Sequence, residues 1–217
     1  MRLAPPASPA RPSLWRPTPS RLLRLLVGLT IFGAGEACLV ASELGNSPWT
    51  VFAEGVSLNS PLAIGAATVV ISFAVLLLWV PLRQRPGLGT VANAIVIGLA
   101  IDATLLLLPH APALGLRWTL MVLGIALVAL GSGLYLTAAL GPGPRDGLMT
   151  GLSRRTGASL RAVRVLIELT VLAAGVVLGG TAGIGTLAFA LAIGPGVQLA
   201  VARLATPGWR ALMARAG

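Results

Sequence analysis

Six apolar stretches of about twenty residues each recur along this chain of 217 residues, at 21–42, 61–82, 88–108, 118–140, 159–179 and 185–204. A transmembrane helix needs about 20 apolar residues because the hydrocarbon core of a bilayer is about 30 Å thick. The mean hydropathy of +0.89 is far above that of an ordinary soluble domain. We therefore predict an all-α membrane protein with six transmembrane helices.

The first stretch, residues 21–42, resembles a secretory signal in its position but is about twice as long as a signal's apolar core. Similar stretches follow it, so we expect a retained membrane helix. Residues 1–20 precede it and hold six prolines and three arginines without hydrophobic periodicity. Such a composition predicts a disordered tail.

Two shorter segments interrupt the apolar stretches, one after the first stretch and one after the fourth. Each begins with a glycine followed three residues later by a proline, Gly45 with Pro48 and Gly141 with Pro144. Proline is favoured at the first position of a helix. We predict two short interfacial or re-entrant helices; the simpler alternative for the glycines and prolines is a tight reversal of the chain.

The chain also repeats itself at an offset of 96 residues without a gap. Of 82 aligned positions 22 are identical, against about 8 expected by chance. Arg21 aligns with Arg117 and Gly28 with Gly124. The predicted organisation is a cytoplasmic tail, two transmembrane repeats separated by an external linker, and a C-terminal cytoplasmic tail, at residues 1–20, 21–108, 109–116, 117–204 and 205–217.

Each repeat holds three predicted spans, and three is an odd number. The second repeat must therefore start on the opposite side of the membrane, which makes the repeats inverted. With both termini in the cytoplasm, fifteen of the sixteen arginines lie on the cytoplasmic side and only Arg117 lies outside. This distribution matches the excess of basic residues in cytoplasmic loops.

Two acidic residues fall inside predicted spans, Glu36 in the first and Asp102 in the third, both in the outer half of the membrane. A charge at the bilayer centre costs about 2.5–3.5 kcal/mol on insertion scales, so it usually faces a cavity or a partner. With Glu43 and Glu54 nearby, they predict an electronegative outer vestibule for protons, metal cations or organic amines. The alternative is that both are protonated and hydrogen-bonded to neighbouring helices.

Further polar residues lie in the inner half. Arg164 and Glu168 are one helical turn apart, which favours a buried ion pair or, alternatively, a site at Arg164 for an anionic group. Asn93 is a candidate substrate contact or a helix-to-helix hydrogen bond.

Charged residues also surround the second short segment. Asp146 is placed to cap its helix. Arg145, together with Arg154 and Arg155, is typical of a cytoplasmic anchor that contacts anionic lipids.

Composition disfavours several functions. Cys38 and His110 are the only residues of their types, so we expect neither a disulfide framework nor a metal or cofactor site, and we do not expect an enzyme. The net charge of +10 is distributed between apolar stretches rather than along one solvated face, which argues against nucleic-acid binding. The glycine-rich stripes serve packing within or between subunits, so they leave the oligomeric state open.

The motifs LGNSPWTVFAEGVS at 44–57, GLGT at 87–90, GPGPRDGLMTGLSRRTG at 141–157, VRVLIE at 163–168 and GIGT at 183–186 resemble the YczE/YyaS/YitT-like family of bacterial membrane proteins. The resemblance implies an integral protein of the cytoplasmic membrane and no settled activity. In that family the residue after Pro48 and Trp49 is usually aspartate, where this chain has Thr50. At this paired position of the two short segments, only the second segment has an acid, Asp146.

Two functions remain in competition. Inverted repeats are a recurrent architecture of secondary transporters, whose sites lie at the repeat interface beside short or broken helices. We therefore expect a small transporter or exporter of an unknown small solute. The alternative is a scaffold or regulatory protein that acts through its arginine-rich cytoplasmic face without transporting anything.

Overall fold

The computed structural model describes residues 13–108, 113–205 and 209. Over these residues the chain forms eight α-helices and no strand: α1 Pro19–Ser42, α2 Pro48–Leu58, α3 Ile64–Leu77, α4 Leu88–Leu105, α5 Leu114–Thr137, α6 Pro144–Thr156, α7 Leu160–Val177 and α8 Ile184–Leu204. Most of the expected tails, 1–20 and 205–217, and half of the linker 109–116 lie outside the described residues. The all-helical class is therefore confirmed where the structure describes the chain.

Each predicted apolar stretch contains one helix, and each of the two short segments forms a helix with proline in its first turn. Within the described ranges, α1, α4, α5 and α8 are long and apolar enough to cross a membrane. The remaining two depart from the prediction for different reasons. Helix α3 has only 14 residues and continues as tight hydrogen-bonded turns to Arg83. Helix α7 carries three charged side chains, Arg161, Arg164 and Glu168.

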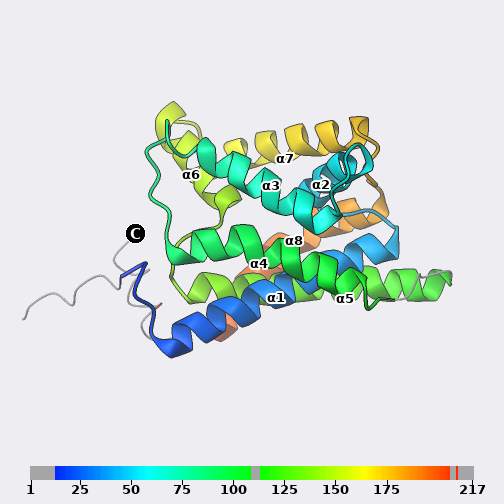
Figure 1. Cartoon of the computed structure of the whole chain (residues 1–217), viewed down its shortest axis with the longest axis horizontal. Coiled ribbons are helices and arrows are strands. Elements are labelled where there is room, and N and C mark those ends of the chain that lie inside the picture. Colours follow the sequence, from blue (N-terminus) through cyan, green and yellow to red (C-terminus); the bar gives the residue numbers. More distant parts are fainter. Residues whose placement is uncertain (1–12, 109–112, 206–208, 210–217) are drawn as a thin grey trace, which may run out of the picture.

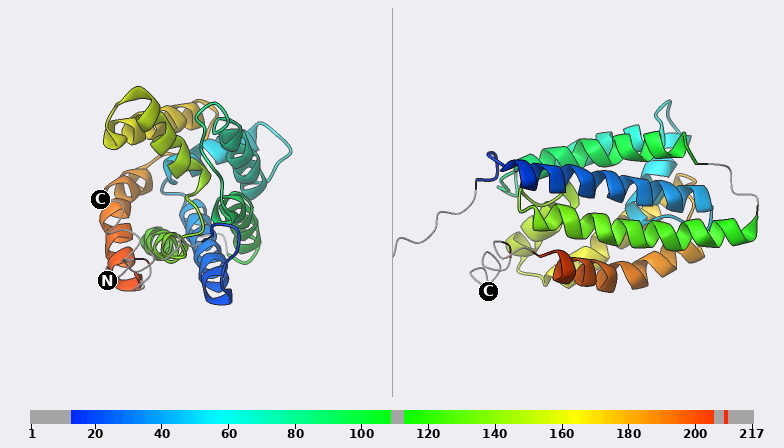
Figure 2. Two further views of the ribbon diagram at one scale, coloured as in Figure 1. Left: turned by 90° about the vertical axis from the view of Figure 1, so that its left-hand side faces the viewer. Right: turned by 90° about the horizontal axis from the view of Figure 1, so that it is seen from below.

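The helices form two layers (Figures 1 and 2). The long helices pack in the order α4, α1, α5, α8, with the most extensive contact between α1 and α5. The second layer holds α3 and α7 with the two short helices between them, and α3 packs on α4. Helices α2 and α6 lie toward opposite ends of the bundle (Figure 1).

The helix starts repeat along the chain. The first residues of α2, α3 and α4 each precede those of α6, α7 and α8 by 96 positions, as Pro48 and Pro144, Ile64 and Leu160, and Leu88 and Ile184. The two halves of the chain therefore consist of the same elements in the same order.

Helices α1 and α5 run antiparallel and cross on glycines. A Cβ on Gly28 would lie 2.9 Å from the carbonyl oxygen of Gly131, and one on Gly35 would lie 2.8 Å from that of Gly124. Because Gly124 and Gly131 are the repeat equivalents of Gly28 and Gly35, each helix presents the same surface to the other. An isologous contact of this kind is what a two-fold axis produces.

The ends of α1 and α5 are held by equivalent arginines. Arg21 donates hydrogen bonds to the carbonyl oxygens of Ala138 and Ala139 at 2.9 and 2.6 Å. Its equivalent, Arg117, donates to those of Ser42 and Glu43 at 2.8 and 2.9 Å. Each arginine therefore satisfies main-chain acceptors that the last turn of the other helix leaves free.

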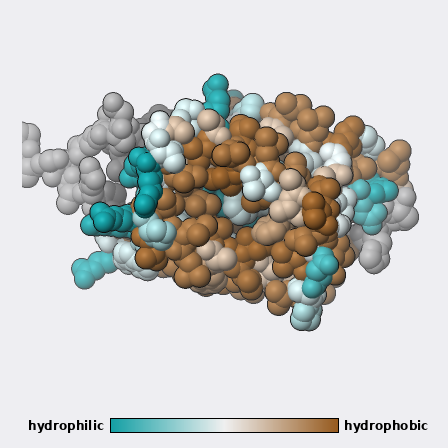
Figure 3. All heavy atoms as spheres, turned by 90° about the horizontal axis from the view of Figure 1, so that it is seen from above, coloured by the Kyte–Doolittle hydropathy of each residue, from teal (hydrophilic) through white to brown (hydrophobic). Residues whose placement is uncertain are grey.

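The long sides of the molecule are apolar. The face in Figure 3 is predominantly hydrophobic, and hydrophilic residues gather toward its ends. Large apolar side chains remain exposed on several helices, including Leu123 of α5, Leu169 of α7 and Leu191 of α8. This distribution is typical of a surface in contact with lipid.

Candidate functional site

A cavity of about 280 Å³ lies between the two helix layers, and both halves of the chain line it. Six pairs of repeat-equivalent residues occur in its wall, among them Phe32 with Val128, Glu36 with Ser132, and Asn93 with Phe189. The cavity therefore lies where the two halves meet.

Both short helices direct their N-termini at this cavity. Ser47 precedes α2 and Gly143 precedes α6, and both line the wall. The chain reaches these positions through Gly45 and Gly141, whose φ angles of 115° and 117° favour glycine. The glycine and proline parts of the predicted motif therefore shape the turns, while the residues after the prolines face the cavity.

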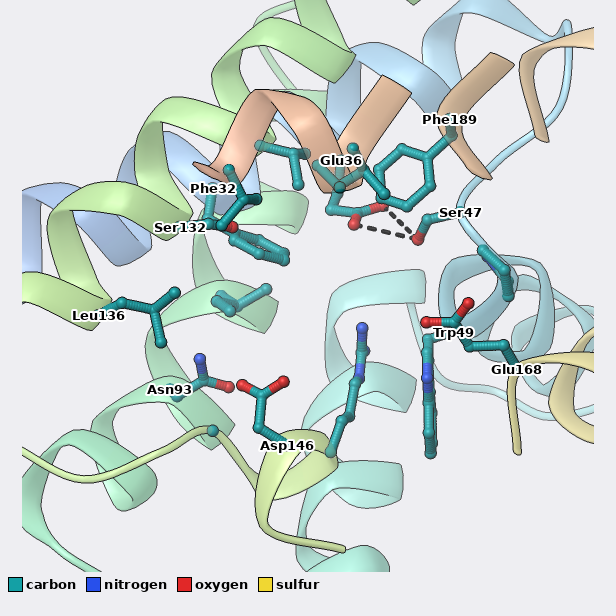
Figure 4. Close-up of a pocket in the computed structure, with 18 of the residues that line it drawn as sticks. Phe32, Glu36, Ser47, Trp49, Asn93, Ser132, Leu136, Asp146, Glu168 and Phe189 are labelled. Carbon is teal, nitrogen blue, oxygen red and sulfur yellow. Dashed lines mark hydrogen bonds between the residues drawn. The ribbon is translucent and has the colours of Figure 1, made fainter. Parts of the chain in front are cut away.

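Glu36 is a residue of α1, and its side chain lies against the N-terminus of α2. Only 1% of its surface is exposed. Its carboxylate accepts hydrogen bonds from the hydroxyl of Ser47 at 3.0 and 2.8 Å (Figure 4). It also accepts one from the hydroxyl of Thr50 at 2.8 Å. The equivalent position in the second half is Ser132, so no carboxylate occupies the corresponding place beside α6. The two ends of the site are chemically different.

Arg145 and Trp49 occupy equivalent positions of the two short helices and touch each other. The guanidinium carbon of Arg145 lies 4.9 Å from the centre of a Trp49 ring. No hydrogen bond or ion pair engages this guanidinium within the described part of the chain. Arg145 therefore faces the cavity, and the sequence-based interpretation as an anchor in contact with lipid does not describe its position.

Asp146, the next residue on α6, accepts a hydrogen bond from the hydroxyl of Tyr135 at 2.7 Å. The expectation that Asp146 caps α6 is wrong, because the N-cap residue is Gly143 and the side chain turns to α5 instead. Figure 4 shows Asp146 beside Asn93, on the opposite side of the cavity from Glu36 and Ser47. Asn93 lines the cavity and makes no hydrogen bond within the described chain. The expected hydrogen bond between helices is therefore not made by its side chain.

The predicted ion pair between Arg164 and Glu168 is present, with Nε and Oε1 2.9 Å apart. The pair is not buried as expected, since 52% of the Arg164 side chain and 30% of the Glu168 side chain remain accessible. Both residues line the cavity. They are exposed because α7 makes little contact with α8, the helix that would otherwise cover them.

The structure places Asp102 outside the cavity. Its carboxylate accepts from the backbone N–H groups of Gly65 and Ala66 at 2.7 and 3.0 Å, at the start of α3. The expected outer vestibule of acids is not formed. Glu43 pairs with Arg117 at 3.1 Å, and Glu54 accepts from Thr181 and Asn46.

Sequence reasoning missed two residues of the wall, Tyr135 and Ser47, and also Thr50, which donates to Glu36 behind it. Tyr135 is the chain's single tyrosine and lies inside a predicted span, which was a usable signal. Ser47 follows the N-cap preference for serine, but nothing local indicated that its hydroxyl and that of Thr50 would donate to Glu36. Among the described residues no group of three His, Cys, Asp or Glu side chains is placed to hold a metal ion.

Three bacterial proteins are similar to the chain over most of its length. An uncharacterized protein of Haemophilus influenzae is 42% identical over 198 residues, covering 91% of each chain. The uncharacterized membrane protein YczE of Bacillus subtilis is 33% identical over 170 residues, covering 77% of this chain and 79% of YczE. The uncharacterized protein YyaS of the same organism is 29% identical over 168 residues, 74% of this chain and 82% of YyaS.

No solved structure matches the chain. The resemblance inferred from the sequence motifs is confirmed for YczE and YyaS, and the first of these is named as a membrane protein. A family model described as "Family of unknown function (DUF6198)" matches residues 19–201, which include all but the last three residues of the eight helices. The chain is therefore a membrane protein that belongs to the DUF6198 family.

Proposed function

We propose that this protein is a secondary transporter or exporter of the bacterial cytoplasmic membrane. Six spans in two inverted repeats, with both termini in the cytoplasm, enclose a central site for a small solute. The single observation that carries the proposal is the cavity between the halves, whose wall contains equivalent residues of both.

The inverted arrangement is supported by the antiparallel contact of α1 with α5. A two-fold axis that relates two antiparallel helices runs perpendicular to them, and in a membrane-spanning bundle it lies in the membrane plane. The reciprocal contacts of Arg21 and Arg117 obey the same axis. They also give Arg117, the only arginine assigned to the outside, a structural role.

Alternating access is supported by one difference between the halves. Helix α3 packs along α4, whereas α7 and α8, their equivalents, make little contact. If the halves exchanged these arrangements, α7 would close on α8 and α3 would separate from α4. The cavity would then open between α3 and α4 instead of between α7 and α8, and such an exchange is how inverted repeats expose a fixed site to each side in turn.

A scaffold without transport is the competing function. It needs no cavity, and its charged residues would be sealed in helix contacts. Asp102 is sealed in this way at the start of α3, but Glu36 and Glu168 line the cavity together with Arg145, Asp146 and Arg164. The cavity therefore favours transport over a scaffold.

Cysteine accessibility tests this proposal without knowledge of the solute. In a Cys38→Ala background, Ser132→Cys places a thiol in the cavity wall. We expect an impermeant maleimide to label it from both sides in right-side-out and inverted vesicles. Ser72→Cys, at a buried position of α3 outside the cavity, should be labelled from neither side. Labelling of position 132 from one side only would contradict alternating access.

Reporter fusions test the topology separately. Fusions at Arg154 should report the cytoplasm and fusions at His110 the exterior. The same side for both would refute the six-span inverted arrangement, and the reverse result would refute the cytoplasmic location of the termini.

A further inference from the structure

The cavity is open sideways, between α7 and α8. In the first half, a Cβ on Gly98 of α4 would meet the carbonyl oxygen of Gly65 and the side chain of Val69, both on α3. The equivalent glycine of α8, Gly194, has nothing within 4 Å of its Cβ position and lines the cavity. The equivalent of Val69 is Val165, which is 51% exposed.

Apolar side chains border this opening. On α7, Leu166 and Leu169 are 63% and 58% exposed, and on α8, Leu187 and Leu191 are 62% and 71% exposed. Because the side chains along both edges are apolar and exposed, we expect the opening to face lipid hydrocarbon rather than water.

A charged pair lies inside the opening. Arg164 and Glu168 are joined by one short contact at 2.9 Å, and each keeps accessible surface. Charged groups near lipid are costly unless polar partners surround them. A polar head group that passed between α7 and α8 would find such partners there.

Deeper in the cavity, Arg145 has hydrogen-bond donors without an acceptor. Its guanidinium contacts the Trp49 ring and makes no hydrogen bond within the described residues. The three carboxylates of the wall accept their hydrogen bonds from other groups, Glu36 from two hydroxyls, Asp146 from Tyr135 and Glu168 from Arg164, and attract Arg145 without a hydrogen bond. The planar fork of an arginine matches the oxygens of a phosphate or carboxylate.

We propose that the solute is an amphiphile with a phosphate-monoester head group, which enters from the lipid between α7 and α8 and binds Arg145. A monoanionic phosphate offers oxygens to the guanidinium and a hydroxyl donor to the free oxygen of Asp146. The cavity of about 280 Å³ is small for a whole amphiphile, so it holds the head group while the chain remains in the apolar opening. This inference deepens the proposed function, because it assigns a solute to the same cavity.

Binding of decyl phosphate to the protein in phosphatidylcholine nanodiscs tests the head-group site, with empty nanodiscs subtracted. We expect saturable binding, and at least tenfold weaker binding by Arg145→Gln, because the charge-assisted hydrogen bonds to phosphate are lost. The matched control is Arg154→Gln on the same helix, whose side chain bonds Gln84 outside the cavity and should leave binding unchanged.

Two further probes separate the parts of the amphiphile. Inorganic phosphate has the head group without a chain and should bind at least tenfold more weakly than decyl phosphate. Decyltrimethylammonium has the chain with a cationic head group and should not compete. Equal binding of inorganic and decyl phosphate would show a site for a free anion and overturn the amphiphile. Equal binding of the cationic probe would overturn the role of Arg145.

The side entrance has its own test. Gly194→Phe fills the open space on α8 and should slow the association of decyl phosphate at least fivefold. Gly115→Phe, at a glycine that also has nothing within 4 Å, lies at the start of α5 away from the opening and should not. A photoreactive group at the end of the decyl chain should label α7 and α8. Labelling confined to other helices, or equal association rates for both variants, would refute lateral entry.

These results are distinguishable from a failure of the proposed function. Decyl phosphate binding with one-sided labelling of Ser132→Cys would keep the amphiphile site and refute transport. Two-sided labelling without decyl phosphate binding would keep transport and refute the amphiphile.

Discussion

Trp49 and Arg145 are 96 residues apart and occupy the same position in the two repeats. They are in contact, with the guanidinium carbon of Arg145 4.9 Å from the centre of a Trp49 ring. Two equivalent residues meet only near the axis that relates their halves. In the proposed inverted arrangement, their contact therefore places the two-fold axis at the wall of the cavity. It also shows how the halves have diverged chemically, since one contributes an aromatic ring and the other a cation.

The Trp49–Arg145 contact is expected to stabilise the fold. A cation over a Trp ring contributes about 0.5–2 kcal/mol, depending on how far it is desolvated. In a double-mutant cycle with Trp49→Leu and Arg145→Met, the free energy of unfolding in mixed SDS micelles should show a coupling of about 1 kcal/mol. Strictly additive effects would mean that the stacking contributes nothing to stability.

Arg21 and Arg117 should contribute similarly to stability, because they make equivalent main-chain contacts and the exposed ion pair of Arg117 with Glu43 adds little. Each donates two hydrogen bonds to main-chain carbonyls, and charged hydrogen bonds are worth about 1.5–3 kcal/mol. Arg21→Gln and Arg117→Gln should each lower the free energy of unfolding by about 1–3 kcal/mol. The exposed Arg16→Gln, outside these contacts, is the control. A loss at only one of the two positions would argue against the equivalence.

Glycines at the crossing of α1 and α5 should not tolerate a methyl group. In Gly131→Ala the new Cβ would lie 2.6 Å from both the Gly28 carbonyl oxygen and the Phe32 nitrogen, so the helices must separate. We expect a loss of about 1–3 kcal/mol. Gly115→Ala, in open space, should be neutral or slightly stabilising because alanine is the better helix former. The two variants should therefore shift the thermal unfolding midpoint in different directions.

Asp102 is expected to act in stability rather than in transport. Asp102→Ala removes both acceptors from the N-terminus of α3 and should cost about 0.5–2 kcal/mol, as the loss of a helix cap does. Two-sided labelling of Ser132→Cys should persist in this variant. Its repeat equivalent Gln198, which bonds nothing in the described chain, should be replaceable by alanine without loss of stability. Loss of labelling with unchanged stability would return Asp102 to the list of transport residues.

Much of the secondary structure was predictable because it depends on local properties. Hydropathy located the six apolar stretches, and a proline three residues after a glycine located α2 and α6. The sequence-based boundaries failed at α3, which ends at Leu77 rather than near residue 82. There the chain tightens into turns that bury Trp79, whose indole N–H donates to the carbonyl oxygen of Pro144 on α6 at 2.9 Å. That partner is 65 residues away, so no local pattern contains it.

The sequence by itself determined the membrane as solvent, the helical elements, the repeat and the candidate charges, because apolar runs, helix-start residues and self-similarity are properties of the chain order. Only the tertiary structure decided what those charges do. Asp102 holds the end of a helix, whereas Arg145 faces a cavity. The same packing leaves α7 apart from α8 although Val165 and Gly194 match the residues that close α3 on α4. Which residues meet across a helix interface depends on how the two helices cross. Identical residues at these equivalent positions do not determine that crossing.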